Sequence, residues 1–569
     1  MNVVESILLE EGPCLSSELA RKLAAHGLSA EVARQRISRA GPNVLRLKGL
    51  IFPRNARFVF HETQEYTEAY WKALARDIKA ASPAYGPALA ALQAREGVVP
   101  LPQFAIISGS PIRQLGQVSS DTVLERLEAV RIVERIELEG IGPVVALRAD
   151  GYLGRPNLPG LRARLVVEKM LLLALRDWAR RLGVASYDRI EIRGEGDTLP
   201  TFGTFHWDLC GPSYMVPLVR RQKDAPPKPG FLVADALAGG VVNEAAIAAF
   251  VRKFTLSSYL KKLPPFLPIL IADGFTQEAF NLGRSQGLMM ATPKNLFGRD
   301  VAIGLATLLE TLSRAAAIAV AKPEVIGQLF DKLGSIEGAD RNLRGSLFEL
   351  VVGHVVQARH GGSIDINHLV RFERFSGEVD VRRVLAGDVW IYECKGYQPD
   401  HLIDVDEIEV WLTKKIPGLY LATKAENRFN NSEVHFEFWT SGGFTQAAIA
   451  RLEQARASTR RYTVGWKSGA EVRAELARLS SSGMATMFDQ HFLKHPIASF
   501  ERRHDGSGAL ADLGLAPTLA FEPTDPTPTP ATPTLLPLRT NETALQLVPG
   551  SADHSASNTH PPPDVAAAE

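Results

Sequence analysis

Length and composition limit the architectures open to this chain. With 569 residues, 45% of them apolar and 22% charged, it is too long for one hydrophobic core and too apolar to be disordered over most of its length. The formal net charge is +1, but residues from 505 onward contribute −7, so residues 1–504 carry about +8. A mildly basic body is compatible with a polyanionic partner but does not require one.

The three cysteines are far apart and lack the spacing of a zinc site or a disulfide framework. The sequence starts MNVVESILLEEG, with acidic residues where a secretory signal would be basic. No apolar run reaches the ~18 residues that span a bilayer. We therefore expect a cytoplasmic protein with no membrane contact and no small-molecule cofactor.

Residues 1–62 have the pattern of three helices followed by a β-hairpin, an order that resembles a winged helix. The third helix, over residues 29–40, and the hairpin over residues 44–60 are rich in long basic side chains. Such donors can reach phosphates and base edges in a major groove. The alternative is a helical adaptor with a solvated basic face. The residues expected to contact DNA are Arg34, Arg36, Arg39, Arg46, Lys48 and Arg54.

Residues 63–150 repeat this order, with a helix over 119–130 and strands over 132–138 and 143–147. The helix carries Asp121, Glu125 and Glu128, which would repel phosphate. We interpret this unit as a second winged-helix-like domain with a structural or partner-binding role.

Two stretches, residues 155–320 and 335–480, alternate long helices with apolar strands. The expected fold class is therefore multidomain α/β, with α+β winged helices at the N-terminus. The two stretches also echo one another. Each has a Glu on an early apolar helix, then an Asp at a strand, then an acid near the end of another strand. In chain order these are Glu168, Asp208 and Asp235 upstream, and Glu349, Asp380 and Glu393 downstream.

Nearly the same words then follow in both stretches, GFTQEAF at residues 274–280 and GFTQAAI at residues 443–449. A Thr cap that opens a helix after a strand can arise twice by chance. The matching order of four features makes duplication of one unit the better explanation.

The downstream strand WIYECKGY carries the chemistry. Residues two apart in an extended strand point to the same face, so Glu393 and Lys395 project together while Cys394 turns into the core. The preceding strand is expected to pair with it through a turn at residues 386–388, which would bring Asp380 beside Glu393. Glu378 shares a strand face with Asp380 and is interpreted as a solvated edge charge rather than an accessory ligand.

Converging carboxylates make a hard oxygen site suited to Mg²⁺, with Mn²⁺ as an alternative. Such a metal polarises a phosphodiester oxygen and activates a bound water. The expected ligands are Asp380, Glu393 and the backbone carbonyl of Cys394. Lys395 would orient or help deprotonate the attacking water and stabilise developing negative charge.

These residues resemble the motif of the PD-(D/E)xK restriction-endonuclease-like superfamily, most closely its Mrr-like branch. The resemblance covers about residues 341–467, and Asp380, Glu393 and Lys395 match the motif in type and order. Glu349, in RGSLFELVVGHVV, matches the acid that many members carry on the first core helix, where it would complete the metal shell. Val379 departs from the nominal proline. The resemblance implies an α-β-β-β-α-β core and nuclease activity, and the alternative is a structural ion-pair cluster.

In the upstream stretch the position equivalent to Lys395 is Leu237. Without that ammonium, the stretch is expected to be an inactive nuclease-like domain that scaffolds or binds DNA, and the alternative is an unrelated α/β domain. Further along, the helix over residues 405–416 ends in Lys414 and Lys415. These lysines are interpreted either as phosphate contacts or as a solvated helix end.

The function expected from these features is Mg²⁺-dependent endonucleolytic cleavage of DNA, by analogy in restriction or phage defence. A homodimer is plausible, because cutting both strands needs two sites. The rivals are a noncatalytic DNA-binding regulator that uses a nuclease-like fold, and an RNA-directed nuclease. Residues 505–569, rich in Pro and Thr, are expected to be a disordered tail.

Overall fold

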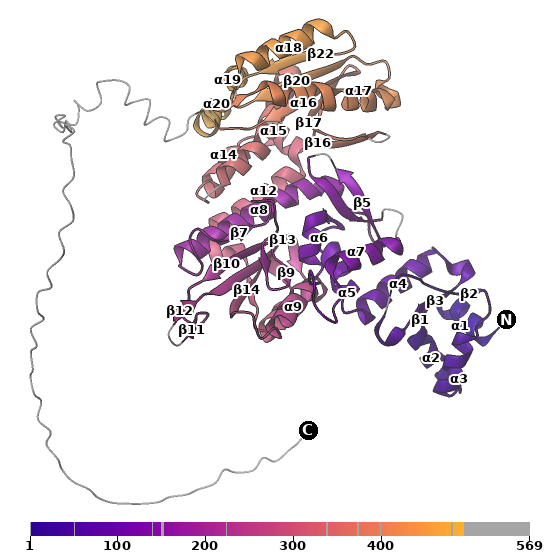
Figure 1. The fold of residues 1–569 in the computed structure, drawn as a ribbon. Coiled ribbons are helices and arrows are strands. Elements are labelled where there is room, and N and C mark those ends of the chain that lie inside the picture. The colour runs from indigo at the N-terminus through magenta and orange to yellow at the C-terminus, as the bar shows by residue number, and fades with distance from the viewer. Residues whose placement is uncertain are drawn as a thin grey trace, which may run out of the picture. The chain divides into compact units, whose positions relative to one another are not determined.

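The computed structural model describes residues 2–493, apart from short gaps at residues 51, 139, 149–152, 223–224, 337–338, 373–374, 399 and 480–481. The described chain is a mixed α/β protein, as expected (Figure 1). The predicted tail, residues 505–569, lies outside the described residues.

The N-terminal unit packs three helices against a small antiparallel sheet. Leu8, Leu19 and Ile37 each bring one helix into the same buried cluster, which Val59 of the sheet completes. The sheet has the strand order β1-β3-β2. The elements are α1 (Val3–Glu11), β1 (Cys14–Leu15), α2 (Ser16–Ala25), α3 (Ala30–Ser38), β2 (Val44–Arg46) and β3 (Phe58–His61).

The next unit adds four helices and a second three-stranded sheet of order β4-β6-β5. The Ser119 hydroxyl caps helix α7 by accepting the N–H of Thr122. The elements are α4 (Glu68–Ala81), α5 (Tyr85–Gln93), β4 (Val98–Pro100), α6 (Leu101–Ile107), α7 (Ser120–Ala129), β5 (Val133–Leu138) and β6 (Gly142–Leu147).

Residues 158–291 form the upstream half, whose five-stranded sheet has the order β15-β14-β13-β10-β7. Strand β13 is apolar almost throughout because it is buried on both faces: Leu232 and Ala234 pack on one side, and Val233 and Leu237 on the other. The principal elements are α8 (Leu158–Arg181), β7 (Glu191–Ile192), β10 (Leu209–Ser213), β13 (Gly230–Val242), α9 (Glu244–Ser258), β14 (Phe266–Phe275), α10 (Gln277–Ser285) and β15 (Met289–Ala291).

Residues 339–477 form the downstream half, whose five-stranded sheet has the order β16-β17-β18-β20-β22. The principal elements are α15 (Ala339–His360), β16 (Ser363–Phe372), β17 (Phe375–Leu385), β18 (Asp388–Lys395), α16 (Val405–Val410), a π-helical turn η3 (Trp411–Lys415), α17 (Ile416–Ala425), β20 (Val434–Thr440), α18 (Gln446–Ser458), β22 (Thr463–Lys467) and α19 (Gly469–Ala477).

The two halves have the same topology. In each, a long helix precedes three antiparallel strands, and two further strands then join in parallel after helical crossovers. The repeated GFTQ segments also have the same structural role, since Thr276 caps α10 and Thr445 caps α18. The structure therefore bears out the expected echo between the halves at the level of strand order and caps.

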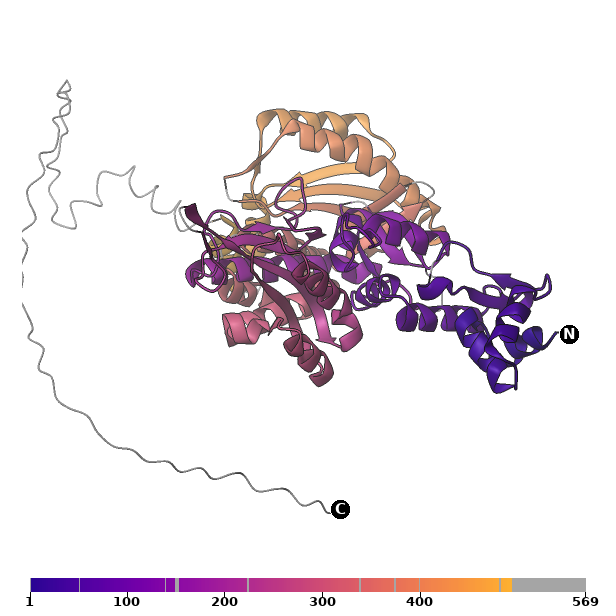
Figure 2. The same cartoon turned by 60° about the horizontal axis from the view of Figure 1, so that its bottom comes forward.

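The downstream sheet lies between two apolar layers. Tyr392 and Cys394 of β18 face a large core that includes α15, whereas Val389 and Ile391 face a separate core built from α16 to α18. Figure 2 shows these strands between their helices. The larger core also takes in Leu171 and its neighbours on α8, so it runs from one half into the other.

Further helices lie between and after the two halves. They are α11 (Pro293–Phe297), α12 (Arg299–Ser313), α13 (Ala315–Ala321), α14 (Val325–Leu333) and α20 (Ser482–Phe488). Among the described helices, none is by itself both long and apolar enough to cross a membrane, and α12 with α13 meets that test only as a pair bent by 102°.

Candidate metal and catalytic site

A tight hairpin brings Asp380 and Glu393 together. Strands β17 and β18 are joined by Ala386 (φ 52°) and Gly387 (φ 96°), and positive φ at both positions suits the twist of a two-residue hairpin loop. The antiparallel register pairs Val381 with Tyr392, and its next step sets Asp380 opposite Glu393. Residues directly opposite in an antiparallel pair share one face of the sheet.

Asp380 is also tied to the next strand by its side chain. Its Oδ2 accepts the backbone N–H of Cys394 at 2.7 Å, and the residue is only 6% exposed. Burial raises the pKa of the Asp380 carboxyl, and the negative charge of Glu393 adds to this effect. The side chain of Cys394 is buried in the core, as predicted.

Glu393 is held by two ammonium groups. Lys395 Nζ lies 2.7 Å from Oε1 of Glu393, and Lys415 Nζ lies 2.7 Å from Oε2. Burial alone would raise the pKa of Glu393, but these two charges and their hydrogen bonds lower it below its usual range. The pKa values of Lys395 and Lys415 are raised in return, against the effect of burial.

Glu349 approaches from α15, on the other side of the sheet, and is 2% exposed. Burial raises the pKa of Glu349 to about 8, and the charges of Asp380 and Glu378 reinforce this shift against that of Arg162. The sequence did not point to Arg162, which reaches the site from α8 of the upstream half. Its guanidinium lies 2.7 Å from Oε1 of Glu349 and 2.8 Å from Oε1 of Glu378.

Glu378 is a buried ion-pair partner of Arg162 and not a solvated charge. This residue is 9% exposed, so its interpretation as a solvated edge charge is wrong. The solvated reading is also wrong for Lys415, which contacts Glu393, whereas its neighbour Lys414 is exposed. The partner of Glu378 comes from an element distant in the sequence, whereas Lys415 is turned toward Glu393 at the end of a π-helical turn.

The four predicted residues Glu349, Asp380, Glu393 and Lys395, together with Glu378, Arg162 and Lys415, thus form a buried cluster of four acids and three cations. Oxygen ligands of this kind fit Mg²⁺ or Mn²⁺, which Asp380, Glu393 and Glu349 would hold. In the described part of the chain, however, their carboxylates do not form a set of three within 4.8 Å of one another. The ammonium and guanidinium groups of Lys395, Lys415 and Arg162 are the cations beside these acids.

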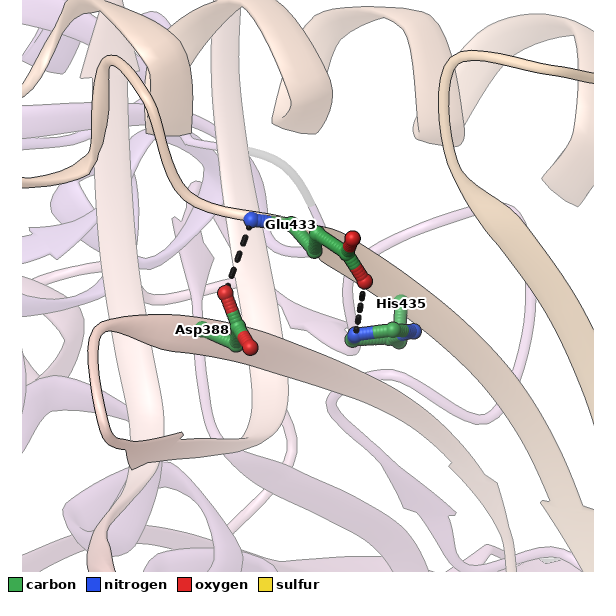
Figure 3. Close-up of side chains that lie close together, drawn as sticks. All are labelled: Asp388, Glu433 and His435. Carbon is green, nitrogen blue, oxygen red and sulfur yellow. Dashed lines mark hydrogen bonds and ion pairs between the residues drawn. The ribbon is translucent and has the colours of Figure 1, made fainter.

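A different group of side chains is close enough together to hold a metal ion. Ligand atoms of Asp388, Glu433 and His435 all lie within 4.8 Å of one another (Figure 3). Asp388 accepts the Glu433 N–H at 2.9 Å, and His435 Nε2 lies 3.9 Å from Glu433 Oε2. No sequence pattern predicted this group, which joins the first residue of β18 to the start of β20.

This second group is remote from the acids of the hairpin. Asp388 and Glu393 are five residues apart along β18, or about 16 Å in an extended strand. The Glu433 side chain is 80% exposed, and the His435 ring stacks on Trp390 with 4.4 Å between centroids. Exposed acidic groups of this kind are common without a metal, so proximity alone does not make this group the reactive centre.

The upstream half has acids at the equivalent places, and they are neutralised from within. Asp208 accepts the N–H of Ala236 at 2.9 Å, as Asp380 does that of Cys394. The guanidinium of Arg193 bridges two carboxylates of this set, at 2.6 Å from Asp208 and 2.8 Å from Glu168.

The third upstream acid, Asp235, pairs with Lys253 of α9 at 2.6 Å. Leu237, the counterpart of Lys395, is 4% exposed in an apolar cluster. The strand ammonium is therefore missing from the upstream half, as the sequence indicated, but a helix lysine is present.

The predicted DNA-contacting residues of the N-terminal unit are exposed in the structure. Part of the hydrogen-bonding capacity of Arg46 is used within the protein. Its guanidinium donates to the carbonyls of Ile37 and Ser38 at 2.6 and 3.2 Å and so ties β2 to the end of α3. The exposed residues are Arg34, Arg36, Arg39, Arg46, Lys48 and Arg54.

In comparisons with known proteins, no protein-family model, no curated protein and no solved structure matches this chain.

Proposed function

We propose that the protein is a metal-dependent nuclease of the PD-(D/E)xK type that hydrolyses DNA phosphodiesters. The observation that carries this proposal is the hairpin of β17 and β18, which sets Asp380 opposite Glu393 with Lys395 on the same strand face. Glu349 reaches the same cluster from α15. Acids that can hold a divalent cation, beside an ammonium that can stabilise negative charge, suit the hydrolysis of a phosphodiester.

A bound Mg²⁺ would polarise the phosphodiester and lower the pKa of a water, and the chain's own groups would do the rest. Because the pKa of Lys395 is raised, its ammonium keeps its proton. It therefore acts as a donor that orients the nucleophilic water and stabilises developing negative charge, rather than as a base. Glu393, with its lowered pKa, stays ionised.

The N-terminal units would supply affinity for the nucleic acid. We propose that residues 1–62 form a winged helix whose exposed arginines on α3 contact the DNA backbone. The upstream half would serve as an inactive nuclease-like scaffold, because Leu237 stands at the position of Lys395 and the strand ammonium is missing. A role in restriction or phage defence, and a homodimer, follow only by analogy.

Cleavage of supercoiled plasmid with Mg²⁺, with EDTA, and by Lys395→Ala tests the reaction. Cutting with Mg²⁺ alone, abolished by both EDTA and the substitution, is the expected result. The same assay on structured RNA decides whether the 2′-hydroxyl is tolerated. Exposed Lys414 offers a matched control, since Lys414→Ala on α16–η3 leaves every site contact in place.

One observation favours a second candidate, a noncatalytic DNA-binding regulator. The acids Glu349, Asp380 and Glu393 are only 2–6% exposed. A regulator would bind DNA equally with Mg²⁺, with EDTA and after Lys395→Ala, and would cut under none of these conditions.

A further inference from the structure

We propose that Lys415 is a positioning residue of the nuclease site, which holds one oxygen of Glu393 so that Lys395 is free to serve the substrate. This inference rests on the proposed function. It assigns different tasks to two lysines that contact the same carboxylate, one on the strand and one on the helix that follows it.

The contact geometry separates the two lysines. Each ammonium takes a different oxygen of Glu393, both at 2.7 Å. The Lys415 side chain is 18% exposed and that of Lys395 is 29% exposed, so Lys395 is the more accessible of the two. With one oxygen held from the helix, the plane of the buried carboxylate stays fixed when the strand ammonium turns toward another anion.

Local helix geometry presents Lys415 to the site. Residues Trp411–Lys415 form a π-helical turn between α16 and α17. Such turns insert one residue into a helix and often occur at functional sites. Lys415 reaches inward to Glu393 from the end of this turn, whereas Lys414 faces solvent.

The upstream half supplies an independent comparison. Helix α9 follows β13 as α16 follows β18, and its Lys253 contacts the strand acid Asp235. Lys253 is ten residues past the helix cap Asn243, and Lys415 is eleven past the cap Asp404. The π-helical turn accounts for the extra residue.

The helix lysine is therefore common to both halves, and only the strand lysine distinguishes the half with the complete motif. Because the upstream half keeps its helix lysine although it lacks the strand lysine, we assign the helix lysine the role of holding the strand acid in place. The group found only in the complete motif, Lys395, is the one left to act on the substrate.

The test uses the full chain with Lys415→Ala, Lys415→Arg and the matched control Lys414→Ala. Steady-state cleavage gives kcat and KM for DNA, and electron paramagnetic resonance gives the affinity for Mn²⁺. For Lys415→Ala we expect kcat to fall about 100-fold, the loss typical of a misplaced reacting group. KM should stay near the wild-type value, and Mn²⁺ should bind as tightly as before or more tightly, because one repelling cation is gone. Lys415→Arg should restore part of kcat, and Lys414→Ala should change none of these quantities.

Three results would overturn the inference. A rise in KM with unchanged kcat would make Lys415 a DNA-backbone contact. Wild-type kcat in Lys415→Ala would leave it no role in positioning. Loss of Mn²⁺ binding together with a lowered melting temperature, not rescued by arginine, would make it a structural ion pair. Failure of the proposed function looks different, because the wild-type protein itself would then not cut DNA.

Discussion

The carboxylate of Asp380 accepts the backbone N–H of Cys394 at 2.7 Å, across the hairpin and one residue beyond Glu393. The strand acid is thereby fixed by the main chain of its neighbour. An asparagine can accept the same hydrogen bond, so the charge at this position can be removed without loss of the contact.

For Asp380→Asn we accordingly expect folding to be preserved and metal affinity to fall at least about tenfold, with cleavage abolished. Calorimetric titration with Mn²⁺ and plasmid cleavage measure these effects. His435→Ala is the matched control, since it disrupts the remote group of possible ligands. Normal cleavage by Asp380→Asn together with loss of cleavage in His435→Ala would move the reactive metal to that group.

Glu349 should make stability depend on pH in the absence of metal. Its pKa is about 8 in the folded chain, raised chiefly by burial, and about 4.3 when unfolded. The folded state therefore binds the extra proton between these values, and the stabilisation present at low pH is lost as pH rises toward 8. Denaturant unfolding in EDTA should show Glu349→Gln gaining stability relative to wild type from pH 5 to pH 8.

Glu475 should make stability depend on pH in the opposite direction, because its pKa is lowered rather than raised. Burial would raise its pKa, but the hydrogen bond and charge of Lys467, with the charge of Arg359, lower it. Its contribution to stability is present above its unfolded pKa and is lost on acidification. Glu475→Gln should be destabilised at pH 7 and approach wild type at acid pH. Parallel pH profiles for the two variants would contradict both assignments.

Lys253 should matter for stability rather than for chemistry. It is 1% exposed, pairs with Asp235 at 2.6 Å, and lies 4.0 Å from the centre of the Trp207 ring. Lys253→Met would leave a buried carboxylate without its partner and should cost about 3–5 kcal/mol in the free energy of unfolding. Exposed Lys262 is the control. Equal stability of both variants in urea would show that the pair contributes nothing.

The exposed arginines on α3 and at its C-cap should determine the salt dependence of DNA binding. Replacing Arg34, Arg36 and Arg39 one at a time by alanine should weaken binding to all sequences alike. Each loss should reduce the slope of log affinity against log salt by about one. Arg21→Ala on α2, an exposed residue paired with Glu18, serves as control. Unchanged slopes would point to a protein-binding role for this unit.

The strand part of the site was predictable from sequence because its signals are local. The two-residue period of WIYECK and a nearby turn were enough to place Asp380, Glu393 and Lys395. The apolar run around Glu349 marked its helix. The repeated order of acids and caps predicted that the two halves echo one another, and their sheets do have the same topology.

The cations that complete the site were not predictable in this way. Arg162 lies 187 residues before Glu349 in the sequence, and no local pattern announces a contact of that span. The inward direction of Lys415 depends on a π-helical turn. The turn shifts the helix phase by one residue, so a 3.6-residue period does not predict which face Lys415 lies on. Lys253, within the apolar run AFVRKF, is one case where a charge on a buried face was a usable signal.

The largest hydrophobic core joins Leu171 of α8 to Leu347 and Val351 of α15. Separation of the two halves would expose this apolar surface to water. A fragment starting at residue 335 would therefore aggregate or unfold rather than fold as an autonomous unit. In the full chain, the two halves should melt in a single cooperative transition.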